Sequence, residues 1–114
     1  MNNDPYQTAQ IQRLALGILA QAQRDRATEL VFSTATRAAI PVRYKVNETW
    51  HDWSGPPPRL VPEVVAELGR LARFTKRPFP KEGLIDVPYS GIRVCWVMRM
   101  SSDDADCILT SVEA

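Results

Sequence analysis

The stretch Ile40–Trp53, which reads IPVRYKVNETWHDW, decides the fold of this 114-residue chain. Its apolar residues Val42, Tyr44 and Val46 alternate with two basic residues, which is the period-two pattern of a strand with one buried face. A short polar turn at 47–49 follows, and two tryptophans lie on the return. The stretch therefore predicts a β-hairpin, and we expect the sheet that it begins to receive one helix from each side of the sequence.

Two segments with helical periodicity flank the hairpin. In 6–26 the apolar residues follow the i, i+3, i+4, i+7 spacing of one helix face. The same spacing recurs in 59–73, after the breaker SGPPP at 54–58, and Pro62 fits only the first turn of that helix. The first stripe consists of Ile11, Leu14, Ala15, Ile18, Leu19 and Ala22, and the second of Val61, Val64, Val65, Leu68, Leu71 and Ala72.

The other apolar runs predict strands at 29–33, 84–89, 91–100 and 106–112, whereas 74–83, with two prolines and a glycine, predicts a loop. The order is then helix, three strands, helix, three strands (6–26, 29–53, 59–73, 84–112). Strands joined by short turns pair antiparallel. We therefore expect an α+β fold in which two helices pack on a single antiparallel sheet of about five to six strands. The length fits one domain, 1–114.

Composition excludes several classes of protein. The net charge of +1 creates no global field that would attract nucleic acid, and no apolar run approaches the roughly 20 residues that span a bilayer. The N-terminus lacks the basic and apolar regions of a signal peptide, which favours a cytoplasmic protein. The only two cysteines, Cys95 and Cys107, are too few for a disulfide framework, so we expect both to be reduced.

No group of residues in the sequence specifies a reaction. His51 is the only histidine, lacks the further ligands of a metal site, and is expected at the surface or packed in the hairpin. Asp103, Asp104 and Asp106 suggest a cation loop, but the glycine and the distal glutamate of an EF-hand are missing, so a solvated turn is the better interpretation. The sequence contains neither G-x-x-x-x-G-K-[ST] nor G-x-G-x-x-G, the two glycine motifs whose loops bind phosphate groups. We therefore expect no catalysis, no cofactor and no metal.

Five basic residues gather at the end of the second predicted helix and in the loop after it. They are Arg70, Arg73, Lys76, Arg77 and Lys81. Basic residues at a helix C-terminus interact favourably with the helix dipole, which accounts for the first two without any partner. The functional interpretation is a contact surface for an acidic partner or a phosphate. Both interpretations stand at this point.

Each of the three tryptophans either belongs to the hydrophobic core or forms part of a contact surface. Trp96 alternates with strand neighbours and is expected in the core. Trp50 and Trp53 either cover the sheet or form an exposed contact patch, and we expect burial, because large aromatic side chains are usually buried.

Four short motifs, in order, resemble a known family. They are ATELVFS at 27–33, RYKVNE at 43–48, PKEGL at 80–84 and IRV at 92–94. Their order and spacing over about residues 8–112 resemble the sheet-bearing domain that precedes the motor core of type II secretion and type IV pilus assembly ATPases. The family patterns are A-S-D-I-H-x-E, R-Y-R-I-D-G, P-Q-D-G-R and F-R-V. The resemblance implies a PAS-like α+β fold.

The chain also departs from the family pattern. The family histidine falls on Val31, its glutamate on Ser33, its hairpin Asp-Gly on 47–48, and the arginine after the loop glycine on Leu84. Several polar positions are thus replaced, and the sequence contains no motor core, which argues against a contribution to ATP turnover. The initial Met and the acidic tail fit the expectation of a stand-alone protein, and a fragment of a longer protein stands as the alternative.

Two functions follow as hypotheses. The first is a non-catalytic protein-interaction or accessory module, with a secretion or pilus motor ATPase as the implied partner. The second is a PAS-like domain that senses a small ligand or nucleotide, with a pocket lined by Tyr44, Trp96 and Met98. The edge strands of such a sheet could also pair two copies into a homodimer.

Overall fold

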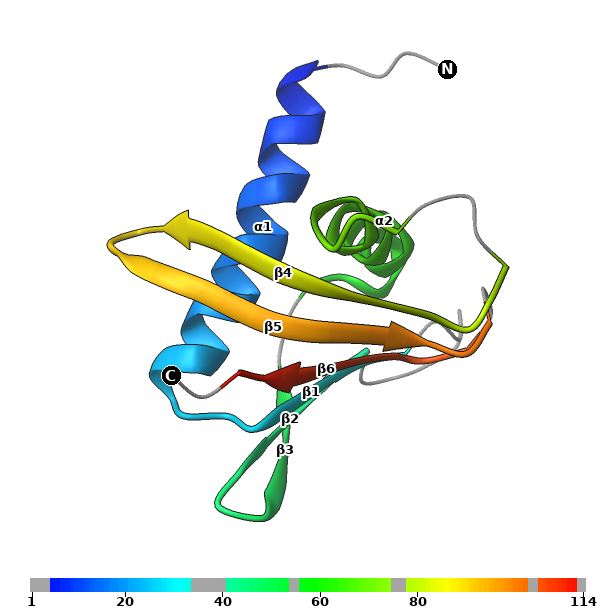
Figure 1. The fold of residues 1–114 in the computed structure, drawn as a ribbon. Coiled ribbons are helices and arrows are strands. Elements are labelled where there is room, and N and C mark those ends of the chain that lie inside the picture. The colour runs from blue at the N-terminus through cyan, green and yellow to red at the C-terminus, as the bar shows by residue number, and fades with distance from the viewer. Residues whose placement is uncertain (1–4, 34–40, 54–55, 75–77, 103–104, 113–114) are drawn as a thin grey trace.

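The computed structural model describes residues 5–33, 41–53, 56–74, 78–102 and 105–112. Its elements confirm the predicted order of helix, three strands, helix and three strands (Figure 1). They are α1 (Pro5–Arg24), β1 (Glu29–Phe32), β2 (Val42–Val46), β3 (Thr49–Trp53), the 3₁₀ turn η1 (Pro58–Leu60), α2 (Val61–Leu71), β4 (Lys81–Tyr89), β5 (Ile92–Met100) and β6 (Cys107–Ser111).

The strands form one six-stranded antiparallel sheet in the order β3-β2-β1-β6-β5-β4. The last strand of the chain, β6, lies between β1 and β5, so Leu30 of β1 is flanked by Tyr44 and Leu109. The predicted hairpin is confirmed as β2–β3. Its turn is Asn47–Glu48, where φ is 51° and 65°, as a two-residue turn with left-handed geometry requires.

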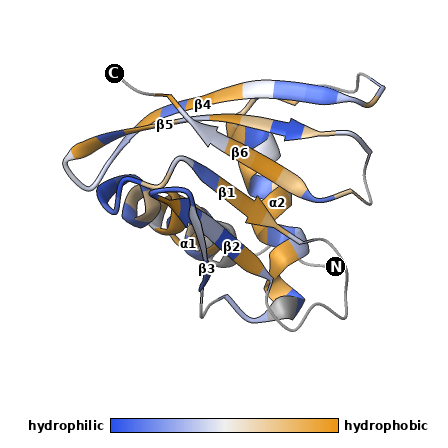
Figure 2. Cartoon of the chain, turned by 90° about the horizontal axis from the view of Figure 1, so that it is seen from below, coloured by the Kyte–Doolittle hydropathy of each residue, from blue (hydrophilic) through white to orange (hydrophobic). Residues whose placement is uncertain are grey.

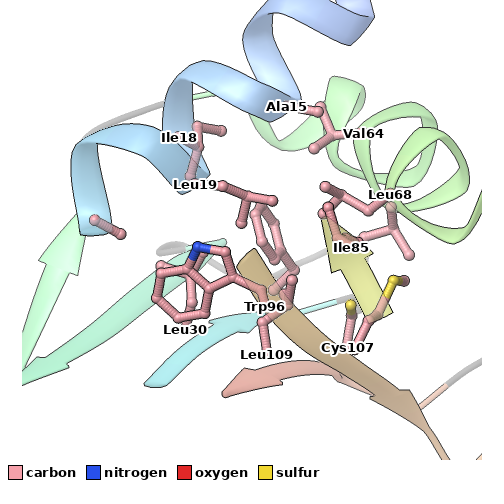
Figure 3. Close-up of a cluster of buried hydrophobic side chains, with 14 of the residues drawn as sticks. Ala15, Ile18, Leu19, Leu30, Val64, Leu68, Ile85, Trp96, Cys107 and Leu109 are labelled. Atoms are coloured by element: carbon pink, nitrogen blue, oxygen red, sulfur yellow. The ribbon is translucent and has the colours of Figure 1, made fainter. Parts of the chain in front are cut away.

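Both helices cover the same face of the sheet. α1 packs against α2 and β5, and α2 packs against β4. Figure 3 shows Leu19 of α1 and Leu68 of α2 on one side of the core and Trp96 of β5 on the other, and all three are fully buried. Hydrophobic residues run along the central strands β1 and β6 (Figure 2). Burial between these two layers supplies the main stabilisation of the fold.

The helix ends differ slightly from the predicted bounds of 6–26 and 59–73. α1 ends at Arg24 because Arg26 turns to a φ of 61°, and the Ala27 N–H then donates to the Ala22 carbonyl at 2.9 Å. α2 begins later than expected, because residues 58–60 form the 3₁₀ turn.

The predicted loop over 74–83 is wrong at its end, because β4 begins at Lys81. Gly83, which predicts a break in the sequence, is a strand residue that faces the end of α2. A Cβ at this position would lie 2.2 Å from the carbonyl oxygen of Ala72. The glycine is therefore explained by the close approach of α2 to the edge of the sheet.

The predictions for the aromatic and sulfur residues have mixed outcomes. Trp96 is buried as expected, but Trp50 is 46% exposed, so its predicted burial is wrong. Trp50 lies opposite Lys45, on the face of the hairpin that the helices do not cover, whereas Trp53 is half-buried against the core. Cys95 and Cys107 are both free in this structure, Cys95 half-buried and Cys107 fully buried.

Candidate binding surface

The second face of the sheet carries the most exposed apolar side chains of the described chain. The helices lie behind the sheet in Figure 1, and no described helix covers the front. Among the described residues the exposed large hydrophobic side chains are Trp50, Phe79, Leu84, Ile108 and Val112. All but Phe79 occupy outward positions of the strand alternation or its continuation past β6. Such a concentration on one side typically indicates an interaction surface.

We define the open-face patch as Val31, Leu84, Val97, Ile108 and Val112. The register brings these residues from four strands together. Val31 lies opposite Ile108, and Leu84 lies opposite Val97. Val97 and Ile108 are diagonal neighbours on β5 and β6, and the Val112 N–H donates to the Cys95 carbonyl at 3.3 Å. The patch thus runs over four of the six strands, from β1 to β4, and crosses from β6 to β5 by a diagonal contact, because Arg99 lies directly opposite Ile108 and Thr110 directly opposite Val97.

Cross-strand ion pairs surround the open-face patch. On the β4–β5 side Arg99 contacts Glu82 at 3.1 Å, and the Nε and Nη2 groups of Arg93 both donate to the Asp86 carboxylate. On the other side Arg43 contacts Asp52 at 3.4 Å and Lys45 contacts Glu29 at 3.6 Å. Each positive charge is opposed by a negative one, so the open face carries an apolar centre with a nearly neutral rim.

These pairs also set the electrostatics of the face. The hydrogen bond from Arg93 holds the pKa of the Asp86 carboxyl below its ordinary value. The pKa of Lys45 is raised, chiefly by its hydrogen bond to Glu48 and the charge of that carboxylate. Both groups therefore remain ionised in their pairs at neutral pH, and neither has the shifted pKa of a catalytic acid or base.

Two of the five predicted basic residues, Arg70 and Lys81, are engaged within the fold. The Arg70 Nε donates to the Glu67 carboxylate at 3.0 Å, and Glu67 is only 8% exposed. Lys81 Nζ lies 4.6 Å from the ring centroid of Phe79 and 6.0 Å from that of Phe74. Arg73 is exposed where the chain leaves α2 with a φ of 59°. The other two members, Lys76 and Arg77, lie outside the described residues.

The remaining candidate residues that the structure describes are not grouped with other reactive side chains. His51 stacks on Tyr44 with ring centroids 5.2 Å apart, as predicted for a residue packed in the hairpin. Asp106 is exposed, and Asp103 and Asp104 lie outside the described residues. Within the described ranges, no three His, Cys, Asp or Glu side chains are grouped to hold a metal, and no helix is long and apolar enough to cross a membrane.

The predicted ligand pocket does not coincide with an open hollow that the described residues form. An open hollow of about 390 Å³ lies at the β4–β5 hairpin. It is lined by Asp86, Pro88, Gly91, Ile92 and Arg93. Trp96 and Met98 are instead fully buried in the core, and Tyr44 lies on the β2–β3 hairpin. One feature of the core is unusual: the buried Trp96 Nε1 has no hydrogen-bond partner among the described residues.

Sequence reasoning missed the open-face patch, although a signal for it was present. In 91–100 the apolar Val97 falls in the same alternation phase as Arg93 and Arg99, where a solvated face favours polar residues. Leu84 and Ile108 can be assigned to that face only with the register, which is a long-range property.

Compared with known proteins, the chain matches no family model and no curated protein.

Proposed function

We propose that this chain is a non-catalytic protein-interaction module of the cytoplasm and that a partner protein docks on the open-face patch. The observation that supports the proposal is the apolar patch itself. Leu84 is 49% exposed and Ile108 is 42% exposed, although both lie in regular strands where a polar residue would be solvated at no cost. Exposed apolar residues on adjacent strands are stabilised when a partner removes them from water.

The charges around the patch restrict the chemistry of the partner. Because Arg43, Arg93 and Arg99 are each neutralised by a carboxylate, the face has no excess positive charge for a nucleic acid or a strongly acidic protein. It fits a folded protein surface with an apolar centre and charges of both signs at its rim. The resemblance of the sequence motifs to the domain of secretion and pilus ATPases makes a motor ATPase of that kind the partner that we propose.

Binding of a purified motor ATPase to two charge-inserting variants tests the proposal. Ile108→Glu and Leu84→Glu each place a carboxylate in the patch without altering the core. The dissociation constant measured by titration calorimetry should rise at least tenfold, because docking would have to remove the added carboxylate from water at the centre of the interface. Gln10→Glu on the exposed side of α1 is the matched control and should bind as the wild type does. Absence of binding by the wild type, or equal binding by all variants, would contradict the proposal.

One observation favours a second candidate function, a PAS-like domain that senses a small ligand or nucleotide. The buried Trp96 N–H has no acceptor in the part of the chain that the structure describes, and a ligand with an acceptor atom would supply one. A thermal-shift screen with nucleotides and small metabolites tests this function. A ligand at a hundredfold excess over its dissociation constant adds about 2.7 kcal/mol to the free energy of unfolding. A saturable shift that Trp96→Phe abolishes would support ligand sensing, and a flat response would leave the interaction module.

A further inference from the structure

The two edges of the sheet are protected to very different degrees. The edge strand β4 is packed against α2, and the backbone of Ala72 approaches it closely at Gly83. Tyr89 and Ile92 flank the two-residue turn Ser90–Gly91 and form a hydrogen-bonded pair, so the backbone groups of the next residue, Pro88, point away from β5 toward the open edge. Because proline has no N–H, this position offers no donor to an incoming strand. Edge strands of monomeric proteins are commonly protected in these ways.

Within the described ranges, the other edge strand, β3, has neither kind of protection. Residues 49–52 are all exposed, and the β2–β3 hairpin extends away from both helices (Figure 1). β3 contains no proline and no lysine, which are the residues that usually guard an edge. It carries aromatic residues on both of its faces, and such residues stabilise a paired strand.

The hairpin geometry determines which backbone groups of β3 are free. The two-residue turn makes Val46 and Thr49 a hydrogen-bonded pair of the ladder. Alternation then directs the backbone of His51 and Trp53 toward β2, and directs the N–H and C=O groups of Trp50 and Asp52 outward. These two residues offer donors and acceptors in the pattern that an antiparallel strand requires.

We propose that β3 pairs with β3 of a second copy of this chain, antiparallel and about a two-fold axis through His51. In this register Trp50 lies opposite the partner's Asp52, and Asp52 lies opposite the partner's Trp50. Because these are the outward-directed residues, each pair exchanges two backbone hydrogen bonds. The two six-stranded sheets become one continuous sheet with β4 at both ends, so the dimer has no unprotected edge.

The side chains of β3 are compatible with this register on both faces. On the face toward the helices, Tyr44 already stacks on His51 and meets Trp53 edge to face at 5.2 Å. The two-fold axis extends this cluster into one aromatic row across both hairpins. On the open face, Trp50 lies opposite the partner's Asp52. The charge of each Asp52 is already opposed by Arg43 of its own chain. No like charges lie directly opposite each other across the axis.

Charge exchange at the axis tests both the interface and its register by sedimentation velocity. His51→Lys and His51→Glu each place like charges opposite each other at a closely spaced pair, so each variant alone should dimerise at least tenfold more weakly than the wild type. An equimolar mixture places Lys opposite Glu and should dimerise at least tenfold more tightly than either variant. Leu84→Lys on β4 should dimerise as the wild type does.

Several results would overturn the proposal. They are a wild-type monomer at about 1 mM, variants that dimerise like the wild type, a mixture that stays monomeric, and loss of the dimer in Leu84→Lys. If a His51 variant unfolds, hydrogen exchange of the backbone amides of the wild type replaces the charge-exchange test. The exchange rates of the Trp50 and Asp52 amides should fall at least tenfold as the protein concentration rises. Rates that do not change with concentration would refute the pairing. The dimer and the docking of a partner can fail separately, because the dimer depends on the backbone of β3 and the docking depends on the side chains of the open-face patch.

Discussion

Replacement of Gly83 by alanine tests the packing of α2 against the edge of the sheet. A Cβ at position 83 would lie 2.2 Å from the Ala72 carbonyl oxygen and 3.0 Å from the Ala72 Cβ. Ordinary contacts begin near 3.4 Å, so the shortfall to the oxygen is about 1.2 Å. The atom in the way belongs to the backbone at the end of α2, which cannot rotate aside as a side chain would. The helix end must therefore move off β4.

The magnitude follows from two opposing effects. Forcing an extra methyl group into a packed site costs about 1–3 kcal/mol, whereas the reduced freedom of the unfolded chain returns about 0.4–1 kcal/mol. The net loss in the free energy of unfolding should be about 1–2 kcal/mol. For a domain of this size that corresponds to a decrease in Tm of about 4–8 °C.

Thermal and urea unfolding followed by circular dichroism measure this loss. The matched control is Gly17→Ala in α1, where the added Cβ would lie 4.0 Å from the Tyr89 hydroxyl, an ordinary contact. This variant should be more stable by about 1 kcal/mol, since alanine replaces glycine inside a helix. The same substitution is thus expected to have opposite signs at the two positions. A Gly83→Ala protein as stable as the wild type would refute the described approach of α2 to β4.

Three further predictions concern single side chains. Trp96→Phe should lower the free energy of unfolding in urea by about 1–2 kcal/mol. This is less than the usual loss when a buried tryptophan is replaced by alanine, because the substitution also removes an N–H without a partner among the described residues. A loss above about 3 kcal/mol would mean that this N–H has a partner. Arg93 lowers the pKa of Asp86, so their pair stabilises the fold above the unfolded carboxyl pKa of about 3.9 and is lost as the pH falls through the lower folded value. Asp86→Asn should therefore weaken the pH dependence of stability below about pH 4, and an unaltered acid-unfolding curve would contradict the pair. Burial raises the pKa of Cys107 to about 12, so a thiol reagent at pH 8 should modify Cys95 first and reach Cys107 only on unfolding, with simultaneous modification of both as the contrary result.

Local patterns in the sequence predicted most of the fold. The alternation at 42–46 gave the correct hairpin, and the stripe on α1 contains residues such as Ala15, Ile18 and Leu19 that are all buried. Both depend on the period of one element and on its preference for one buried face. Trp96 was correctly placed in the core for the same reason.

Local sequence patterns did not predict features that depend on which other elements lie beside a given helix or strand. Gly83 resembles a loop residue until the end of α2 is known to lie against it. Trp50 is exposed because the helices do not cover that face of the hairpin, and its own sequence context does not indicate this. The basic cluster likewise changes meaning once Glu67 and Phe79 are seen to contact Arg70 and Lys81.

The candidate surface depends on the strand order to the same extent. Val31 and Ile108 are 77 positions apart in the sequence, yet they lie opposite each other because β6 inserts beside β1. No periodicity within either strand predicts that pairing. The open-face patch is therefore a property of the assembled sheet, and its function is best tested on the folded protein.

The most direct test of the proposed function is a backbone amide shift map recorded while purified, unlabelled motor ATPase is added to the isotope-labelled chain. Docking on the open-face patch predicts the largest shifts or signal losses at Val31, Val97 and Ile108, and none on the solvent-exposed side of α1. Perturbations concentrated on α1 or α2, or an unchanged spectrum at saturating ATPase, would contradict the claim that this chain binds its partner through the open face of its sheet.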